Sequence, residues 1–488
     1  MHWKGGGRLL SNTCPPSYVK LALPKGKLLA PIANLLGELN LGFEDYDNKT
    51  RDYRLQSVTF PYLSAKIFQE RDIPIQVAIG NYDLGICGLD WIEELVTRYP
   101  ASALVKLSSL NYGEGDIYVA ASYHMGISSI LELQLRKNDW RIVSEYPNLA
   151  EVFALSLRLK VFKIFPVWGA AEVYPPEDAD LAVLWAKNER EITAQGLICL
   201  SKLLRANAFL IANRESLGNK DLSWILTRFG PKLTAKPETS IKNKPDTQGE
   251  PTVSRSSWQA KEINLALPDG HQQPPISQFL RRAGFNLEGY SEKALNRRPS
   301  INLDWVGVKV IRPQDMPLQV ANGNFDLAIT GEDWLLDHLY RFPSSPVAKL
   351  LDLGFGKVKI VAAVSQDIAV ANIDELRLLV SSGKFAPIRV ASEYVNIADK
   401  YLRDNHINPY KLIPTWGASE AFLPEDADLL IDNVQTGKTL AQHKLRIIDI
   451  LFQSAACLIG NKDSLASRDK KGKIDFIVQK LRANSPLP

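Results

Sequence analysis

The residues best suited to binding an anion lie near the C-terminal end of the chain, at 432–440. They read Asp-Asn-Val-Gln-Thr-Gly-Lys-Thr-Leu and follow a short apolar run at 427–431. The run predicts a buried strand, and residues 440–445 have the pattern of a helix. A strand-to-helix turn with a glycine, two threonine hydroxyls, a lysine and free helix N–H groups can surround a phosphate. The same residue types also favour an ordinary capped loop, so the turn alone leaves both interpretations open.

The chain contains one series of motifs twice. The repeated pairs are 19–26 with 263–270, 72–77 with 315–320, 83–91 with 326–334, 144–146 with 392–394, and 168–172 with 416–420. The offset is 243 residues for the second and third pairs and 248 for the last two, so the echo is long and nearly free of gaps. Such a repeat indicates a duplication, with two homologous halves in one chain.

The repeat divides the chain into four parts. We expect a leader at 1–17, a first half at 18–229, a flexible linker at 230–260 and a second half at 261–488. The linker is rich in Pro, Lys, Ser and Thr and has few aliphatic residues. Short β-branched runs alternate with helical stretches, which predicts mostly parallel sheets with helices on both faces. Each half is large enough for two α/β lobes, the second inserted into the first at about residues 105–194 and 348–442.

Composition excludes several functional classes. The 488 residues are 45% hydrophobic and 23% charged with a net charge of +4, which gives no electrostatic signature of nucleic-acid or membrane binding. No apolar run reaches the roughly 18 residues of a membrane span, and the start of the chain lacks a signal-peptide core. The four cysteines and six histidines are scattered, so we expect reduced thiols, no protein-built metal site and a cytoplasmic location.

Six motifs in order give the chain a resemblance to a known family. They are Leu-Pro-Lys-Gly-Lys-Leu at 23–28, Arg-Asp-Ile-Pro at 71–74, Asp-Leu-Gly-Ile-x-Gly-x-Asp at 83–90, Ser-Glu-Tyr-Pro-Asn at 144–148, Gly-Ala-x-Glu at 169–172 and the turn at 432–440. Together they resemble the catalytic subunit of ATP phosphoribosyltransferase, over nearly all of both halves. Several motifs in the right order are far more specific than any one of them.

The resemblance implies both a fold and a reaction. The fold is like that of type 2 periplasmic binding proteins, with two α/β lobes around a cleft in each half. The reaction joins 5-phosphoribosyl 1-pyrophosphate to N1 of ATP with release of pyrophosphate, uses Mg²⁺ and opens histidine biosynthesis. Each half resembles the short form of the family, which needs a partner similar to histidyl-tRNA synthetase. Family members also pair, so we expect an intramolecular pseudo-dimer or a homo-oligomer.

The resemblance also assigns candidate site residues. The proposed contacts of the phosphoribosyl donor are Asp432, Asn433, Val434, Gln435, Thr436, Gly437, Lys438, Thr439 and Glu420, of which Asp432, Lys438 and Thr439 are the catalytic candidates. The proposed contacts of ATP are Lys25, Gly26, Lys27, Lys357 and Lys359. Glu172 is a further candidate through the same family match as Glu420.

The two halves depart from the family pattern in opposite ways. The second half has Asp269 where the first has Lys25, and this carboxylate is expected to repel phosphates. The first half has lost the glycine and both threonines of the phosphate turn, which reads 184–191 there. It also has acidic residues within 113–116 where the second half has lysines at 356–359. We therefore expect one divided site per chain, with the second half holding the phosphoribosyl donor and the equivalent site decayed.

Several nearby residues have ordinary structural interpretations. Asp90 is expected to be a helix N-cap, and for Asp333 the cap and the functional role stay open. Trp168 and Trp416 are expected to pack rather than to stack on adenine. The Asp-x-Pro motifs at 72–74 and 315–317 predict entries into strands.

A second function of another class fits the same fold. The decayed motifs suit a catalytically silent protein that senses a nucleotide or histidine, whereas the intact turn at 432–440 favours the enzyme. An extracytoplasmic solute receptor is the third possibility, and the absent signal-peptide pattern argues against it.

Overall fold

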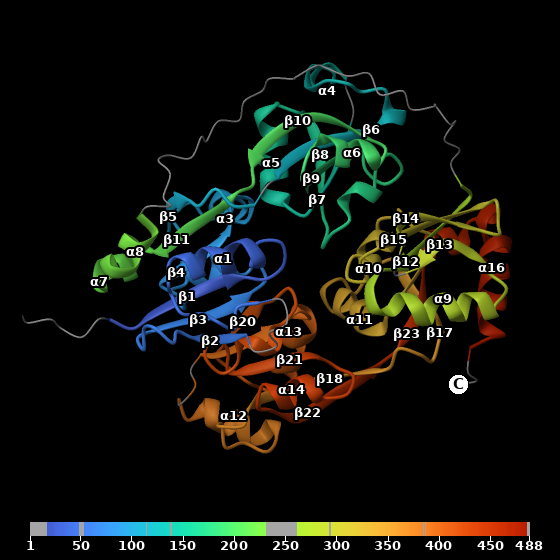
Figure 1. Ribbon diagram of the computed structural model, residues 1–488. Helices are drawn as coiled ribbons and strands as arrows, with labels where there is room; N and C mark the ends of the chain where they lie inside the picture. Colours follow the sequence, from blue (N-terminus) through green and yellow to red (C-terminus); the bar gives the residue numbers. More distant parts are fainter. Residues whose placement is uncertain are drawn as a thin grey trace, which may run out of the picture. The chain divides into compact units, whose positions relative to one another are not determined.

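The computed structural model describes residues 17–47, 53–113, 115–136, 139–230, 261–291, 294–383, 385 and 387–485. The expected leader and linker lie almost wholly outside these residues. Contacts divide the chain into two units, residues 1–113 with 207–238 and residues 114–206 with 239–488 (Figure 1). The first unit is the outer lobe of the first half. The second unit holds the inserted lobe of the first half together with the whole second half.

The outer lobe of the first half is a six-stranded sheet in the order β2-β3-β1-β4-β11-β5. Its elements are β1 (Val19–Pro24), α1 (Leu29–Glu38), β2 (Arg54–Gln56), β3 (Leu63–Phe68), α2 (Ile73–Ala78), β4 (Leu84–Gly88), α3 (Leu89–Arg98), β5 (Leu104–Ser109), β11 (Ala208–Asn213), α7 (Arg214–Asn219) and α8 (Ser223–Phe229). Leu21 and Leu23 of β1 are fully buried and belong to the same core as Ile32 of α1 and Phe229 of α8. The apolar run that predicts β1 is therefore the centre of this core.

The inserted lobe of the first half is a five-stranded sheet in the order β10-β6-β9-β7-β8. Its elements are β6 (Asp116–Ser122), η1 (Tyr123–Met125), α4 (Ile130–Leu135), β7 (Asp139–Ser144), α5 (Pro147–Ser156), β8 (Val161–Pro166), η2 (Ala171–Val173), β9 (Leu181–Ala186), α6 (Glu189–Ala194) and β10 (Leu197–Arg205).

The second half repeats both sheets. Its outer lobe has the order β15-β12-β16-β23-β17 beside a hairpin of β13 and β14, and its inserted lobe has the order β20-β19-β21-β18-β22. The outer lobe consists of β12 (Ile263–Pro268), η4 (Gly270–Gln272), α9 (Gln273–Arg282), β13 (Leu287–Ser291), β14 (Ala294–Ile301), β15 (Val306–Ile311), α10 (Met316–Ala321), β16 (Leu327–Gly331), α11 (Glu332–Arg341), β17 (Val347–Asp352), β23 (Ala456–Asn461), α15 (Lys462–Ala466) and α16 (Arg468–Arg482). The inserted lobe consists of β18 (Val358–Ser365), α12 (Ile373–Ser381), β19 (Ile388–Ser392), α13 (Val395–Asp404), β20 (Tyr410–Pro414), η5 (Ser419–Phe422), β21 (Leu429–Val434), α14 (Lys438–Gln442) and β22 (Leu445–Ser454).

The matching strand orders confirm the predicted tandem duplication and the two-lobed α/β class. The sheets are mixed rather than mostly parallel, which corrects one expectation. In the outer lobes, β11 and β23 return from the inserted lobe and run antiparallel to both neighbours. In the inserted lobes, β6 and β18 run antiparallel to both of their neighbours. The chain leaves each outer lobe for the inserted lobe and later returns to the same outer-lobe sheet. The returning strand, β11 or β23, therefore enters the sheet in the direction opposite to its neighbours.

Two local predictions were wrong. The motifs at 72–74 and 315–317 begin helices α2 and α10 rather than strands, with Asp72 and Asp315 at the N-cap and proline in the first turn. Proline is tolerated there because that N–H has no partner within the helix. The helix expected at 440–445 instead begins at Lys438 and ends at Gln442, because Leu445 already pairs with Ser365 as the first residue of β22.

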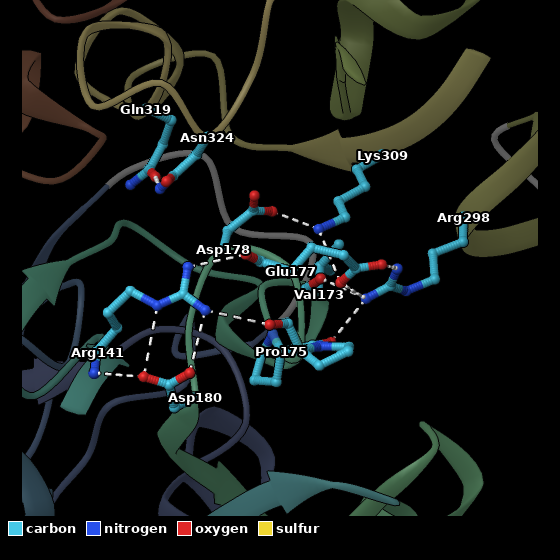
Figure 2. Close-up of polar contacts among 11 residues, drawn as sticks. Arg141, Val173, Pro175, Glu177, Asp178, Asp180, Arg298, Lys309, Gln319 and Asn324 are labelled. Atoms are coloured by element: carbon cyan, nitrogen blue, oxygen red, sulfur yellow. Dashed lines mark hydrogen bonds and ion pairs between the residues drawn. The ribbon is translucent and has the colours of Figure 1, made fainter. Parts of the chain in front are cut away.

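The inserted lobe of the first half packs on the outer lobe of the second. Val173 and Tyr174 share one buried cluster with Ile311 and Met316. Lys309 on β15 pairs with Asp178 and, at 3.1 Å, with Glu177, and Arg298 also binds Glu177 (Figure 2). The side chains of Lys309 and Asp178 are only 8% and 4% exposed. The two halves therefore associate within the chain through this pair of lobes.

The two carboxylates in this contact, Glu177 and Asp178, are paired with the nearby cations Arg298 and Lys309. Burial opposes ionisation of Glu177, but the hydrogen bond from Arg298 and the charge of Lys309 lower its pKa to about 2. Burial raises the pKa of Asp178 in spite of Lys309. Removal of the lysine would leave two neighbouring carboxylates without their buried counter-charge.

We predict that Lys309→Ala destabilises the protein by about 3–5 kcal/mol, because breaking a buried pair leaves an uncompensated charge. The matched control is Lys400→Ala, which removes an exposed pair with Asp404 on α13 and is expected to change stability little. Urea denaturation of the full chain measures both. Equal, small losses for the two variants would contradict the inferred role of the contact.

Candidate active site

The turn at 432–440 forms the end of β21 and the start of α14. Gly437 is the N-cap of α14 with φ of +75°, a left-handed conformation that favours glycine. No side chain caps this helix. Its first N–H groups therefore lack both intrahelical and side-chain partners, which leaves them available to an anion.

The candidate donor contacts surround this helix start. Asp432, Asn433 and Val434 end the strand, and Gln435 and Thr436 lead to Gly437. Lys438 and Thr439 occupy the first turn of α14 and are both exposed. The structure thus gathers a lysine, two hydroxyl groups and the uncapped backbone in one turn.

The neighbouring strand β18 brings two further cations to the turn. Lys359 lies directly opposite Val434 in the antiparallel ladder, and Lys357 is the residue immediately before β18. Both lysines are exposed. These two predicted ATP contacts therefore lie beside the phosphate turn within one lobe.

Asp432 faces a second carboxylate, Glu420 of η5. The residue keeps part of its surface exposed, yet its carboxylate is crowded by protein. Burial raises the pKa of Asp432 to about 7, and the charges of Glu420 and Asp333 act in the same direction, against hydrogen bonds from the Asn433 N–H and from Ser419. An ionised Asp432 is costly here without a ligand that offers protons or positive charge.

The opposite face of β21 is anchored by residues that sequence reasoning did not assign. The amide of Asn433 donates to the hydroxyl of Tyr394 at 2.9 Å, and that hydroxyl donates to Asp333 at 2.6 Å. The only sequence signal for Tyr394 was the repeated Ser-Glu-Tyr motif. Asp333 is not the N-cap of α11, because Gly331 holds that position, and the cap predicted for Asp90 is wrong for the same reason, since Gly88 caps α3.

The first-half copy of the turn is filled by its own side chains. Asn188 is the N-cap of α6 and accepts from the Glu191 N–H at 3.2 Å, while the Glu191 carboxylate accepts from the Lys187 N–H at 2.8 Å. This arrangement is a variant of the capping box, because the carboxylate binds the N–H of the residue before the N-cap. It satisfies the Glu191 N–H at the helix start and puts a carboxylate where the second half has Thr439.

The first-half counterpart of Lys359 is also engaged within its own lobe. Asp116 pairs with Lys202 at 2.5 Å and accepts from the Tyr118 hydroxyl at 3.0 Å. The ring of Trp185, which replaces Asn433, covers Gly115 so closely that a Cβ there would lie 2.4 Å from it. Both substitutions close this copy of the site with protein atoms.

The other basic turn belongs to the first unit. Lys25 follows β1 and donates to the Tyr53 hydroxyl at 2.7 Å, Gly26 has φ of +88°, and Lys27 is exposed. Glu70, which sequence reasoning missed, interacts electrostatically with Lys27. Burial and the charge of Asp90 raise the pKa of Glu70 to about 7, whereas Lys27 lowers it.

Asp269 proves to be a paired residue, which corrects the expectation of a repulsive charge. It binds Arg297 at 2.7 Å and Arg312 at 3.2 Å, and Arg297 reaches Glu172 of the first half at 3.5 Å. Glu172 is therefore held in this ion-pair cluster at the contact between the halves. The outer lobe of the second half lacks the family's basic turn, and the inserted lobe of the first half lacks the phosphate turn. Within the second unit, these two lobes contact each other here.

Trp168 and Trp416 pack as expected. The Trp168 ring lies 5.9 Å from Trp334 and 6.2 Å from Trp416, and its backbone N–H donates to Asp315 at 3.0 Å. Trp334 in turn stacks on Tyr394 at 4.3 Å. A tryptophan of the first half thus supports the aromatic cluster between the two lobes of the second half.

Other site types find little support in the described part of the chain. No group of three or more His, Cys, Asp or Glu side chains is arranged there to hold a metal ion. Cys87, Cys199 and Cys457 are unpaired. None of the described helices combines the length and apolar character needed to cross a bilayer.

The comparisons with known proteins agree on one family. The family model described as HisG: ATP phosphoribosyltransferase matches residues 69–230 and 312–483. An ATP phosphoribosyltransferase of Prosthecochloris aestuarii is 32% identical over 225 residues, 45% of this chain and 70% of the relative. One from Saccharolobus solfataricus is 33% identical over 227 residues, 46% and 72% of the two chains. Each relative corresponds to about half of this chain.

Solved structures with a similar fold also match about half of the chain. The ATP phosphoribosyl transferase (HisG:HisZ) complex from Thermotoga maritima is 20% identical and covers 46% of this chain and 98% of its own, with a TM-score of 0.37. The periplasmic aliphatic sulphonate binding protein SsuA of Escherichia coli is 13% identical and covers 45% and 69%, with a TM-score of 0.29.

The raised pKa of Asp432 predicts a pH-dependent effect of its removal. Its pKa is about 7 in the folded protein against 3.8 ordinarily, so its stabilising contribution is complete below pH 4 and is lost as pH rises through 7. Asp432→Asn should therefore raise Tm more at pH 8 than at pH 5. The control Asp374→Asn, at an exposed position on α12, should show no such difference. A gain independent of pH would contradict the crowded-carboxylate interpretation.

Proposed function

Because this chain belongs to the ATP phosphoribosyltransferase family, we propose that it transfers the phosphoribosyl group of 5-phosphoribosyl 1-pyrophosphate to N1 of ATP. Pyrophosphate is the second product, and the reaction is the first step of histidine biosynthesis. The proposal assigns the donor to the second half. The observation that carries this assignment is the uncapped start of α14 beside Lys357 and Lys359.

The contrast between the halves supports the assignment. At the equivalent position of the first half, Asn188 and Glu191 already satisfy the helix start and add negative charge. A donor phosphate would have to displace this capping box and approach a carboxylate. At the second-half turn it meets backbone N–H groups and the side chains of Thr436, Lys438 and Thr439.

The reaction needs positioning and charge stabilisation rather than a protein nucleophile. The lone pair of adenine N1 attacks the anomeric carbon, the bond from that carbon to the pyrophosphate oxygen breaks, and pyrophosphate leaves with the electron pair. In this scheme the turn 436–439 holds the 5-phosphate, and Asp432 accepts hydrogen bonds from ribose hydroxyls. Lys357 and Lys359 would stabilise negative charge on the phosphates.

ATP has proposed contacts on more than one element. Lys357 and Lys359 lie in the second unit. Lys25, Gly26 and Lys27 form the intact basic turn of the first unit, where Gly26 allows close backbone approach and the two lysines offset phosphate charge. The corresponding turn in the second half carries Asp269, which Arg297 and Arg312 already neutralise.

Magnesium fits the chemistry of the donor site. Asp432 and Glu420 are neighbouring carboxylates, and hard oxygen donors of this kind suit Mg²⁺. The ion commonly binds through substrate phosphates with one or two carboxylates. We propose that Mg²⁺ enters with the pyrophosphate and that Asp432 and Glu420 are its protein-side neighbours.

A regulatory subunit and a cytoplasmic location complete the proposal. The chain shares with the short form of the family two lobes per half and no regulatory domain between the described elements. We propose that a partner resembling histidyl-tRNA synthetase acts on it. Turnover measured with and without such a partner tests this extension, and a silent sensor is the function favoured if neither mixture reacts.

We predict that Gly437→Ala and Thr439→Ala each lower kcat/KM by about 100-fold or more, because they disturb preorganised anion contacts. Lys187→Ala and Arg190→Ala, at the capped first-half copy, should stay within about twofold of the parent. Product formation from ATP and the phosphoribosyl donor in magnesium, followed by ultraviolet absorbance, measures all four. Comparable losses at both turns would contradict an asymmetric enzyme.

A further inference from the structure

Asn433 is the point at which the donor turn is tied to the rest of the second half. It is the penultimate residue of β21, and its side chain points to the face opposite Asp432, since successive side chains of a strand alternate. Its amide donates to the Tyr394 hydroxyl at 2.9 Å. The conformation of the strand end that precedes Gly437 therefore depends on where Tyr394 lies.

Tyr394 is in turn fixed by the outer lobe. Its side chain is 1% exposed, stacks on Trp334 of α11 with ring centroids 4.3 Å apart, and donates to Asp333 at 2.6 Å. The hydroxyl has one proton, which goes to Asp333, and a lone pair, which accepts from Asn433. The direction of each hydrogen bond is thus determined by a carboxylate at one end and an amide at the other.

Asp333 has its own fixed surroundings. One oxygen accepts from the Ser454 hydroxyl at 2.8 Å, and the Asp333 N–H donates back to the Ser454 oxygen at 3.0 Å. The carboxylate lies over Gly331, where a Cβ would come within 2.1 Å of it. Ser454 ends β22, at the crossing from the inserted lobe back to the outer lobe. The carboxylate is therefore held at the junction of the two lobes.

A second contact keeps the same two helices together. Asp337, one turn along α11, accepts from the N–H groups of Asn396 and Ile397 at 2.9 Å each and from the Asn396 side chain at 2.7 Å. It thereby satisfies the start of α13, directly after Tyr394. Helix α11 of the outer lobe consequently fixes both the ring and the backbone of the Tyr394 segment.

The first half has kept two of these residue types and changed the two at the turn and at the lobe crossing. Asp90 and Tyr146 stand at the positions of Asp333 and Tyr394. Trp185 and Ala206 replace Asn433 and Ser454. Alanine has no hydroxyl, and the Trp185 ring covers Gly115 in place of the asparagine amide. The residues lost are the amide at the phosphate turn and the hydroxyl that orients the aspartate. The half with the capped turn is thus the half in which the asparagine amide and the serine hydroxyl are replaced.

We propose that Asp333 and Tyr394 are positioning residues for the reaction, coupling the approach of the two lobes of the second half to the geometry of the donor turn. Their hydrogen bonds hold Asn433, and Asn433 holds the strand end from which the turn departs. When the lobes separate, this support is withdrawn and the turn loses its fixed orientation. The inference deepens the proposed function and rests on the donor binding at 432–439.

The direct test is Tyr394→Phe, which removes the hydroxyl and keeps the ring that stacks on Trp334. We expect KM for 5-phosphoribosyl 1-pyrophosphate to rise roughly tenfold, whereas KM for ATP changes less than twofold. Ser454→Ala, which introduces the first-half residue, should shift the donor KM in the same direction. Asp333→Asn combined with Tyr394→Phe should cost no more than the larger single effect, because the residues act as one unit.

The matched control is Tyr146→Phe, the same change at the equivalent position of the first half. It should leave both KM values within about twofold of the parent, because the first half has a tryptophan at the position of Asn433 and its turn is not assigned to the donor. A donor KM that is unchanged in Tyr394→Phe, or raised equally in Tyr146→Phe, would overturn the proposal.

A measurement without substrates separates this inference from the proposed function. Hydrogen exchange of peptides covering 429–442 should be faster in Tyr394→Phe than in the parent protein, and unchanged in Tyr146→Phe. Faster exchange in a protein that shows no turnover would support the relay and reject the assigned reaction. Unchanged exchange in a protein that turns over normally would reject the relay and leave the reaction standing.

Discussion

A helix begins with backbone N–H groups that its own turns cannot satisfy, and the two halves of this chain resolve that constraint differently. In the first half, Asn188 and Glu191 close the start of α6 with a capping box. In the second, Gly437 starts α14 with no side-chain cap. Since both helices follow equivalent strands of equivalent sheets, the difference comes from a few side chains. On this difference rests the proposal that the second half receives the donor phosphate.

The same division extends through the second unit. Asp116 occupies the first-half position equivalent to Lys359 and is neutralised by Lys202. Asp269 is neutralised by Arg297 and Arg312. Charges that would contact substrate in a working site are thus paired with protein side chains. Near them, the buried contact of Lys309 with Asp178 joins the inserted lobe of the first half to the outer lobe of the second. One set of duplicated positions therefore contributes ion pairs within the protein, and the proposed function assigns substrate to the other set.

The sequence was informative where a pattern repeats or where chemistry is local. The duplication, the strand before residue 432 and the turn at 432–440 follow from motif order and periodicity. The partners of Asp269 could not be foreseen, because Arg297 and Arg312 are 28 and 43 residues away and reach it only through the pairing of β12 with β15 and the adjoining hairpin. Tyr394 and Ser454 were missed for the same reason, since their roles depend on two lobes meeting. The cap expected at Asp90 was wrong, and the question left open for Asp333 is answered against a cap, because Gly88 and Gly331 hold the N-cap positions.

The central claim is that one half of the chain binds the phosphoribosyl donor and the other does not. Isothermal titration of the full chain with 5-phosphoribosyl 1-pyrophosphate in magnesium tests it most directly. The account predicts one binding site per chain, abolished by Gly437→Ala and unaffected by Arg190→Ala. Two equivalent sites per chain, or binding that survives Gly437→Ala, would contradict it.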